Sequence, residues 1–187
     1  MVEHSPHLFA AAEDESEAIV NTGDVLFGRR TRQYHALEHA TVTLLTRRMP
    51  GLSVSARSNT RGFMIFADLD PKLVNAAAAD ALARLQSGER ELAIHPNCGT
   101  NLAVGLSLAM LGSMFSLTAL RPRTRIVSAC ASSLVGIAVA RPVGTVMQRY
   151  VTTLPEVDDV RIASVRRRRF FGRSVVEVLT TADTALR

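Results

Sequence analysis

Two histidines and a glutamate stand close together at residues 35–39, in the order His-Ala-Leu-Glu-His. On an α-helix, residues three and four apart project from the same face, so His35, Glu38 and His39 would lie side by side. Two imidazole nitrogens beside a carboxylate suit a divalent metal such as zinc. The spacing therefore predicts a metal-binding helix face in which His35 and His39 are ligands and Glu38 is the catalytic base.

A zinc site needs at least one further ligand, and the best candidates lie in the stretch His-Pro-Asn-Cys-Gly-Thr-Asn at residues 95–101. His95 offers a third imidazole, and Cys98 offers a thiolate, which also suits zinc. Asp68 and Glu91 are weaker alternatives. The residues leave the choice among these four open.

With three protein ligands, a fourth position would hold a water whose pKa falls toward about 7, and Glu38 would accept its proton. That is the chemistry of a hydrolase of peptide or amide bonds. The alternative is a non-catalytic membrane protein in which the same cluster is structural or empty, because half-buried histidines are also common without a metal.

The pattern of residues 29–49 predicts the helix that carries this face. Leu37, Ala40 and Leu44 form one apolar stripe, and the histidines and the glutamate fall on the opposite side. Pro50 and Gly51 end the helix.

The next segments predict a small α+β unit over residues 29–100, in the order helix, β-hairpin, helix, strand. Residues 52–70 alternate as a β-hairpin. Asp70 and Pro71 are suited to begin a helix that Gly88 ends. Residues 92–94 then read as a short strand.

Residues 101–148 predict a transmembrane hairpin of two helices. Residues 101–120 carry no charge and are long enough to cross a hydrocarbon core of about 30 Å. A basic turn with three arginines follows, and residues 126–140 form a second uncharged run. Small residues recur every four positions in both runs, which suits close helix packing or a homo-oligomer in the bilayer; they are Gly105, Ala109, Ser132, Gly136 and Ala140.

The last segment, residues 149–187, predicts a β-hairpin that joins the sheet of the α+β unit. It contains four consecutive arginines, Arg166, Arg167, Arg168 and Arg169. They are suited to a solvated hairpin tip or to anionic lipid head groups. We expect no nucleic-acid binding, since little aromatic surface for stacking accompanies them.

The composition and the charge distribution indicate where in the cell the protein lies. Residues 1–28 hold six acidic and no basic side chains and predict a disordered acidic tail, while the whole chain carries a net charge of +5. Two distant cysteines form no disulfide framework, and the N-terminus lacks the pattern of a secretory signal. We therefore expect a multi-pass protein of the cell membrane whose soluble unit is cytoplasmic.

The chain shows two resemblances. His-Ala-Leu-Glu-His followed by a hairpin and a helix resembles the inverted zincins, metallopeptidases of the pitrilysin type, which implies proteolysis; their third ligand is a downstream Glu, for which only Glu89 or Glu91 is available here. The paired motifs at 35–39 and 95–101, with an apolar hairpin and a basic β tail, more closely resemble an uncharacterised bacterial membrane-protein family, catalogued as a domain of unknown function. That resemblance implies a membrane protein and lends no activity.

Overall fold

The computed structural model describes residues 23–182, and these divide into two compact units. The first unit comprises residues 23–94 and 149–182, and the second comprises residues 95–148. Most of the predicted acidic tail, residues 1–22, lies outside the described residues.

The first unit is built on a four-stranded antiparallel sheet with the order β1-β2-β4-β3. The strands are β1 (Ser55–Asn59), β2 (Gly62–Phe66), β3 (Val160–Phe170) and β4 (Arg173–Ala182). β4 pairs with β2, so the C-terminal hairpin completes the sheet that the first hairpin begins, as the sequence predicted. The mixed α+β class is confirmed.

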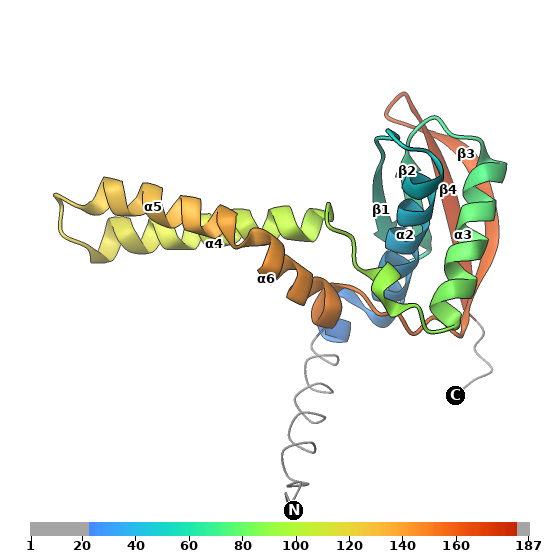
Figure 1. The fold of residues 1–187 in the computed structure, drawn as a ribbon, viewed down its shortest axis with the longest axis horizontal. Coiled ribbons are helices and arrows are strands. Elements are labelled where there is room, and N and C mark those ends of the chain that lie inside the picture. The colour runs from blue at the N-terminus through green and yellow to red at the C-terminus, as the bar shows by residue number, and fades with distance from the viewer. Residues whose placement is uncertain (1–22, 183–187) are drawn as a thin grey trace, which may run out of the picture. The chain divides into compact units, whose positions relative to one another are not determined.

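Helices α2 (Arg29–Arg48) and α3 (Pro71–Gln86) pack against one face of this sheet (Figure 1). The apolar stripe of α2 forms the centre of the core with alternate side chains of β2 and β4. Asp70 caps α3 by accepting a hydrogen bond from the main-chain N–H of Lys72, and Pro71 opens the helix. The predicted start of this helix is therefore confirmed.

The strand predicted at residues 92–94 is wrong, because Arg90–Ala93 form a 3₁₀-helix, η1. The main-chain N–H groups of Leu92 and Ile94 donate to the carbonyl groups of Glu89 and Glu91. These donors are used locally, so the segment cannot add to the sheet. Its apolar side chains are buried nevertheless, since Leu92 and Ala93 join the core.

The N-terminal part of α2 is tied to the segment that follows the second unit. Arg32 is fully buried, and its guanidinium donates to Asp24 (2.6 Å) and to the carbonyl oxygens of Tyr150 (3.0 Å) and Thr153 (3.3 Å). The main-chain N–H of Leu154 donates to the Arg32 carbonyl in return (3.0 Å). These bonds fix residues 150–154 beside the helix.

Gln33 extends this attachment by one residue. Its amide donates to the Glu156 carbonyl (2.6 Å) and to the carboxylate of Asp159 (2.9 Å). Arg30 donates to the side chains of both Gln33 and Asp159. Burial alone would raise the pKa of Asp159, but the hydrogen bonds from Arg30 and Gln33 outweigh it, and the pKa lies below its ordinary value.

The second unit is a helical hairpin. It contains α4 (Gly99–Ala119), α5 (Arg125–Ala138) and α6 (Ala140–Met147), and α6 continues into a π-helical turn over Gln148–Thr152. Within residues 23–182, α4 is long and apolar enough to cross a membrane. α5 with residues 140–152 meets the same standard only as a pair bent by 51°.

The small residues of the hairpin lie between α4 and the helices that follow it. A Cβ on Gly136 would come within 2.5 Å of the Ala109 nitrogen, and one on Gly105 within 2.7 Å of the Ala140 Cβ. Ser113 and Ser133 share a hydrogen bond across the pair (2.6 Å). The small faces are therefore used inside one chain, and their role in a homo-oligomer stays a prediction.

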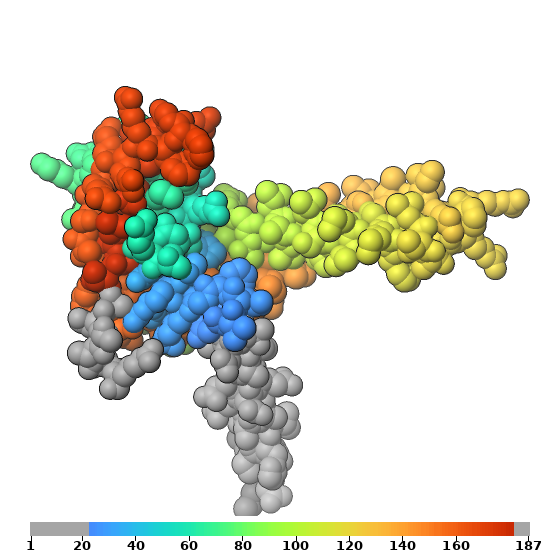
Figure 2. Space-filling model, turned by 180° about the vertical axis from the view of Figure 1, so that it is seen from behind, coloured from blue at the N-terminus to red at the C-terminus, as the bar shows by residue number. Residues whose placement is uncertain are grey.

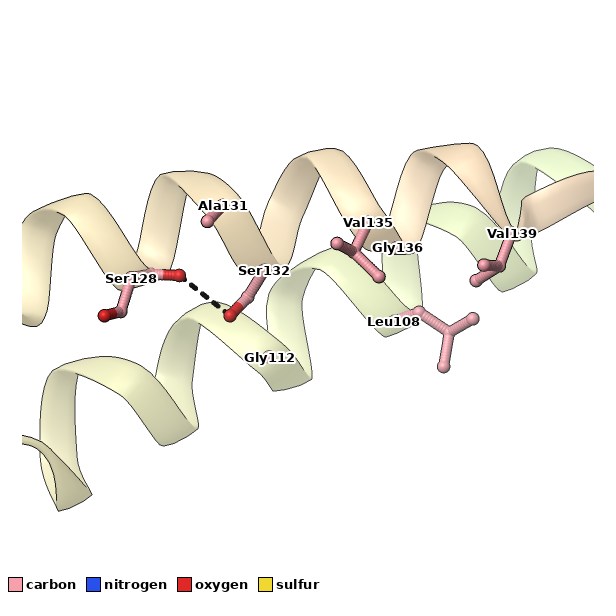
Figure 3. A pocket seen from close by; sticks show the side chains of 8 residues that line it. All are labelled: Leu108, Gly112, Ser128, Ala131, Ser132, Val135, Gly136 and Val139. Atoms are coloured by element: carbon pink, nitrogen blue, oxygen red, sulfur yellow. Dashed lines mark hydrogen bonds between the residues drawn. The ribbon is translucent and has the colours of Figure 1, made fainter.

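A shallow groove runs along the outside of this helix pair (Figure 3). Its volume is about 470 Å³. Small and aliphatic side chains form its walls: Leu108, Gly112, Ser128, Ala131, Ser132, Val135, Gly136 and Val139. The Ser132 hydroxyl donates to the carbonyl of Ser128 on its own helix (2.8 Å), and the only other side-chain polar group among these lining residues is the Ser128 hydroxyl.

Candidate metal centre

His35 and His39 lie one turn apart on α2, as the spacing predicted. Their rings meet edge to face, with centroids 4.3 Å apart. Each offers a ligand nitrogen, and these nitrogens lie within 4.8 Å of one another. His39 is buried and His35 is half-buried. Helical geometry alone thus brings two imidazoles to a separation that one metal ion can bridge.

Both rings are oriented by main-chain carbonyl groups. His35 Nδ1 lies 2.9 Å from the Thr152 oxygen, and His39 Nδ1 lies 2.7 Å from the Ala93 oxygen. A carbonyl oxygen only accepts, so each Nδ1 carries the proton. The neutral rings therefore place their acceptor lone pair on Nε2, which is the arrangement seen when a histidine binds a metal through Nε2.

The charge state of His35 agrees with this role. Burial lowers the pKa of His35, and the hydrogen bond to Thr152 raises it by less, so the net change is downward. The imidazole is therefore neutral at physiological pH and able to act as a ligand.

Glu38 lies between the two histidines in sequence and is buried. Burial raises the pKa of its carboxyl group to about 8, although hydrogen bonds from the side chain and main chain of Ser58 on β1 act in the opposite direction. Among the described residues, its second oxygen, Oε2, has no hydrogen-bond partner. A buried carboxyl group of this kind is costly to keep and is typical of functional sites.

The stretch 95–101 forms the start of α4 in the second unit. Gln148 holds it by accepting from the His95 N–H (2.9 Å) and donating to the Asn101 side chain (2.8 Å). Asn101 in turn donates to the Pro96 carbonyl (2.7 Å). Cys98 is the N-cap of α4, and its sulfur accepts from the Thr100 N–H (3.4 Å). These hydrogen bonds hold the motif as a turn that places the Cys98 thiol at the N-terminus of α4.

Within the first unit, His35 and His39 each offer one nitrogen that could bind a metal ion, and Cys98 of the second unit has a donor atom that also suits zinc. His95 lies in the same turn as Cys98, and its Nδ1 accepts from the Asn97 N–H (3.2 Å). The weaker candidates are engaged elsewhere, since Asp68 pairs with Arg167 and Glu91 with Arg149.

Sequence reasoning missed the groups that orient the site. Ser58, which hydrogen-bonds to Glu38 from β1, lies in the predicted β-hairpin, and the alternation of that strand could have indicated it. The carbonyls of Ala93 and Thr152 have no signal in the sequence, since every residue carries one.

Comparison with known proteins places the chain in a family. An uncharacterized protein of Picosynechococcus sp. strain PCC 7002 is 36% identical over 133 residues, which cover 65% of this chain and 65% of that protein. The match thus spans slightly less than two thirds of the relative's length. No solved structure matches the chain significantly. Residues 30–165, which include all but the first residue of α2 and the whole apolar hairpin, match the family described as a domain of unknown function, DUF6391, and the chain belongs to that family.

Proposed function

We propose that this protein is a membrane-anchored, zinc-dependent hydrolase of peptide or amide bonds. The orientation of the two histidines carries the proposal. Carbonyl groups from two separate segments accept from Nδ1 of His35 and His39, which leaves the unprotonated Nε2 of each ring as the ligand atom, and the buried Glu38 carboxyl group lies on the same helix.

Cys98 is the third ligand in this proposal. Its thiolate is a strong zinc ligand, and the N-terminus of α4 favours a negative charge at that position. His95 is the less suitable choice, because its Nδ1 already accepts a main-chain hydrogen bond within its own turn. With His35, His39 and Cys98 as ligands, a zinc ion would have a fourth position available for water.

The chemistry follows from that open position. A zinc ion held by these ligands would lower the pKa of a bound water toward about 7 and would polarise the carbonyl group of the substrate. Without a metal, burial raises the pKa of Glu38 to about 8; the positive charge of a bound ion would lower it, so that the ionised carboxylate could accept the proton of the water and pass it to the amine that leaves when the carbon–nitrogen bond breaks.

The deciding experiment measures zinc and hydrolysis on the same detergent-purified samples. We expect about one zinc per chain in the wild type and less than a tenth of that in His35→Ala and Cys98→Ala. His95→Ala serves as the matched control and keeps its zinc. Glu38→Gln keeps its zinc but loses at least about 100-fold in cleavage of a fluorogenic peptide library. Wild-type protein purified without chelator that holds less than a tenth of an equivalent of zinc would refute the proposal.

A structural zinc site is the second candidate, and burial favours it. Glu38 is 6% exposed and His39 is 3% exposed, which is unusual for groups that must meet a substrate. X-ray absorption at the zinc edge separates the two functions. A shell of two nitrogens, one sulfur and one exchangeable oxygen supports the hydrolase, whereas four protein ligands support a closed structural site.

The membrane anchor in this proposal is the hairpin of α4 and the bent pair that follows it. Large apolar side chains of both helices are exposed, among them Leu106, Phe115, Ile126 and Leu134. A water-facing hairpin would leave this surface solvated at high cost, which supports a protein of the cell membrane. We place the first unit in the cytoplasm, because basic residues favour that side and Arg90, Arg141 and Arg149 lie toward the end of the hairpin that joins this unit. The turn at the other end also carries three arginines, Arg121, Arg123 and Arg125, so the orientation has to be measured.

Cysteine labelling in intact membranes tests the anchor. Cys130 is exposed on α5, within the proposed span. We expect a membrane-impermeant maleimide to leave Cys130 unmodified until detergent is added. The same reagent should label Thr124→Cys, in the turn between α4 and α5, without detergent. Peptide-resolved mass spectrometry reads each cysteine separately. Fast modification of Cys130 in intact membranes would exclude the span.

A further inference from the structure

We propose that the end of the β3–β4 hairpin docks on anionic lipid head groups. This surface, the arginine tip, consists of Arg166–Arg169, Phe170, Phe171 and Arg173. All of these side chains are exposed, and the tip projects at the surface of the first unit in the space-filling view, where it is coloured orange to red (Figure 2). The proposal is independent of the zinc site.

The strongest observation is Phe171. It occupies the turn between the paired residues Phe170 and Arg173 with a φ of 47°, and Gly172 follows with a φ of 76°. A two-residue turn of this kind favours Asn-Gly or Asp-Gly, since an L side chain in the left-handed region is strained. Phe171 is also 92% exposed. An apolar ring that is both strained and solvated indicates that a partner compensates for it.

The ring does not stand alone. Phe170 packs edge to face against Phe171 (centroids 4.7 Å apart) and against Phe66 of β2 (5.8 Å). This support holds Phe171 outward at the end of the hairpin. The arrangement is suited to shallow insertion of one aromatic ring into the interface of a bilayer.

The charge around the rings matches an anionic surface. Arg167 pairs with Asp68, and both Arg166 and Arg168 pair with Glu177. Within residues 23–182, no ion pair engages Arg169 or Arg173, the two arginines that flank the phenylalanines. Five arginines thus face two carboxylates, and the excess lies beside the exposed ring, where lipid phosphates would lie if the ring entered a bilayer.

Two alternative roles fit the arginine tip less well. Arginines on an edge strand prevent strands of other molecules from adding to the sheet, but this does not account for a solvated phenylalanine at positive φ. Single-stranded nucleic acid binds to open aromatic faces. Here the rings of Phe170 and Phe171 stand nearly perpendicular, at an interplanar angle of 84°, so they do not offer parallel faces on which successive bases could stack.

The chain contains no Trp, so a single Phe171→Trp substitution provides a clean fluorescent probe at the tip. The full chain carrying this substitution is placed in nanodiscs of phosphatidylcholine alone or mixed with phosphatidylglycerol. We expect a blue-shifted emission, quenched at least about twofold by brominated acyl chains, in the anionic discs. Ala79→Trp, on the exposed face of α3, is the control and stays unquenched.

Charge reversal tests the head-group contact. Adding Arg169→Glu and Arg173→Glu to the probe abolishes the quenching, whereas Arg29→Glu and Arg161→Glu, which change the net charge equally at exposed sites by the start of β3, leave it intact. Unshifted emission in anionic discs would overturn the proposal. So would equal quenching of the Ala79 control, or a shift that appears with single-stranded RNA and not with lipid.

Discussion

The ring of His39 donates its Nδ1–H to the main-chain oxygen of Ala93 across 2.7 Å. Fifty-four residues separate the two in sequence, and Ala93 belongs to the 3₁₀-helix that stands where a strand was predicted. The carbonyl is available to a side chain because the segment is not part of the sheet. The departure from the expected strand is therefore what orients one of the two histidines.

This contact predicts that the structural and metal-binding roles of His39 can be separated. In His39→Asn, the amide replaces Nδ1 as a donor to Ala93 but offers no imidazole nitrogen. We expect its free energy of unfolding to stay within about 1 kcal/mol of the wild type in the presence of a chelator, and we expect it to bind no zinc. His39→Ala leaves the buried carbonyl unsatisfied and loses about 1–3 kcal/mol. Denaturant unfolding followed by circular dichroism in detergent measures both. Equal destabilisation of the two variants would contradict this role of the contact.

Glu177 predicts a pH dependence of stability. Burial alone would raise the pKa of Glu177, but hydrogen bonds from Arg166 and Arg168 dominate and the pKa lies below its ordinary value of 4.5. A lowered pKa stabilises the fold above the ordinary value, and this stability is lost as the pH falls through the folded-state pKa. We expect Glu177→Gln to cost about 1 kcal/mol at neutral pH, with the difference from wild type shrinking below about pH 4. Denaturant unfolding over a series of pH values measures this difference.

Glu91→Gln is the matched control for that prediction. The Glu91 side chain is 83% exposed and meets Arg149 at 3.3 Å. An exposed pair contributes little, so this variant stays within about 0.5 kcal/mol of the wild type at all pH values. A constant deficit of Glu177→Gln across the pH range would show that packing, and not ionisation, causes its effect.

Gly62 lies where a side chain has no room, so we expect Gly62→Ala to lower the free energy of unfolding substantially. Its φ is 142°, and a Cβ there would overlap the Val178 oxygen on the neighbouring strand. Gly88 also has a positive φ, 98°, but a Cβ there would meet nothing within 4 Å. Gly88→Ala therefore loses about 1 kcal/mol from backbone strain alone, while Gly62→Ala loses a further 1–3 kcal/mol, roughly, from the clash. Equal losses in thermal unfolding would contradict the strand register.

Gly136 predicts a packing requirement inside the apolar hairpin. A Cβ on this residue would come within 2.5 Å of the Ala109 nitrogen, so Gly136→Leu forces α4 and α5 apart and costs about 1–3 kcal/mol or more. Ala138→Leu, exposed on the same helix, adds the same side-chain type without a clash. Limited proteolysis in detergent distinguishes them, because only the first variant should become sensitive in the turn. Resistance of both would refute this packing.

The sequence predicts elements well where one signal decides them. The stripe of Leu37, Ala40 and Leu44 indicates the buried side of α2, and Asp70 with Pro71 indicates the start of α3. The strand prediction for residues 92–94 is wrong because three apolar residues suit a strand or a buried 3₁₀ turn equally well. Only the location of hydrogen-bond partners separates the two, and that is a tertiary property.

The candidate site, too, is only partly predictable from the sequence. The helix spacing brings His35 and His39 together, and the choice between His95 and Cys98 stays open in the sequence because both lie in one turn motif. The tautomers depend on main-chain oxygens at residues 93 and 152. No residue type reveals such oxygens in advance, so the strongest argument for a metal comes from the structure.

The attachment of α2 to residues 150–159 also sets an order of events during synthesis. The Thr152 oxygen that orients His35 is 117 residues downstream of it. The main-chain oxygens that accept from Arg32, those of Tyr150 and Thr153, also come late in the sequence. While the ribosome is still making the apolar hairpin, α2 has already been synthesised but its partners at residues 150–153 have not. The nascent chain therefore cannot complete the orientation of His35 until the hairpin has been made, and under the proposed function any loading with metal would be a late step of biogenesis.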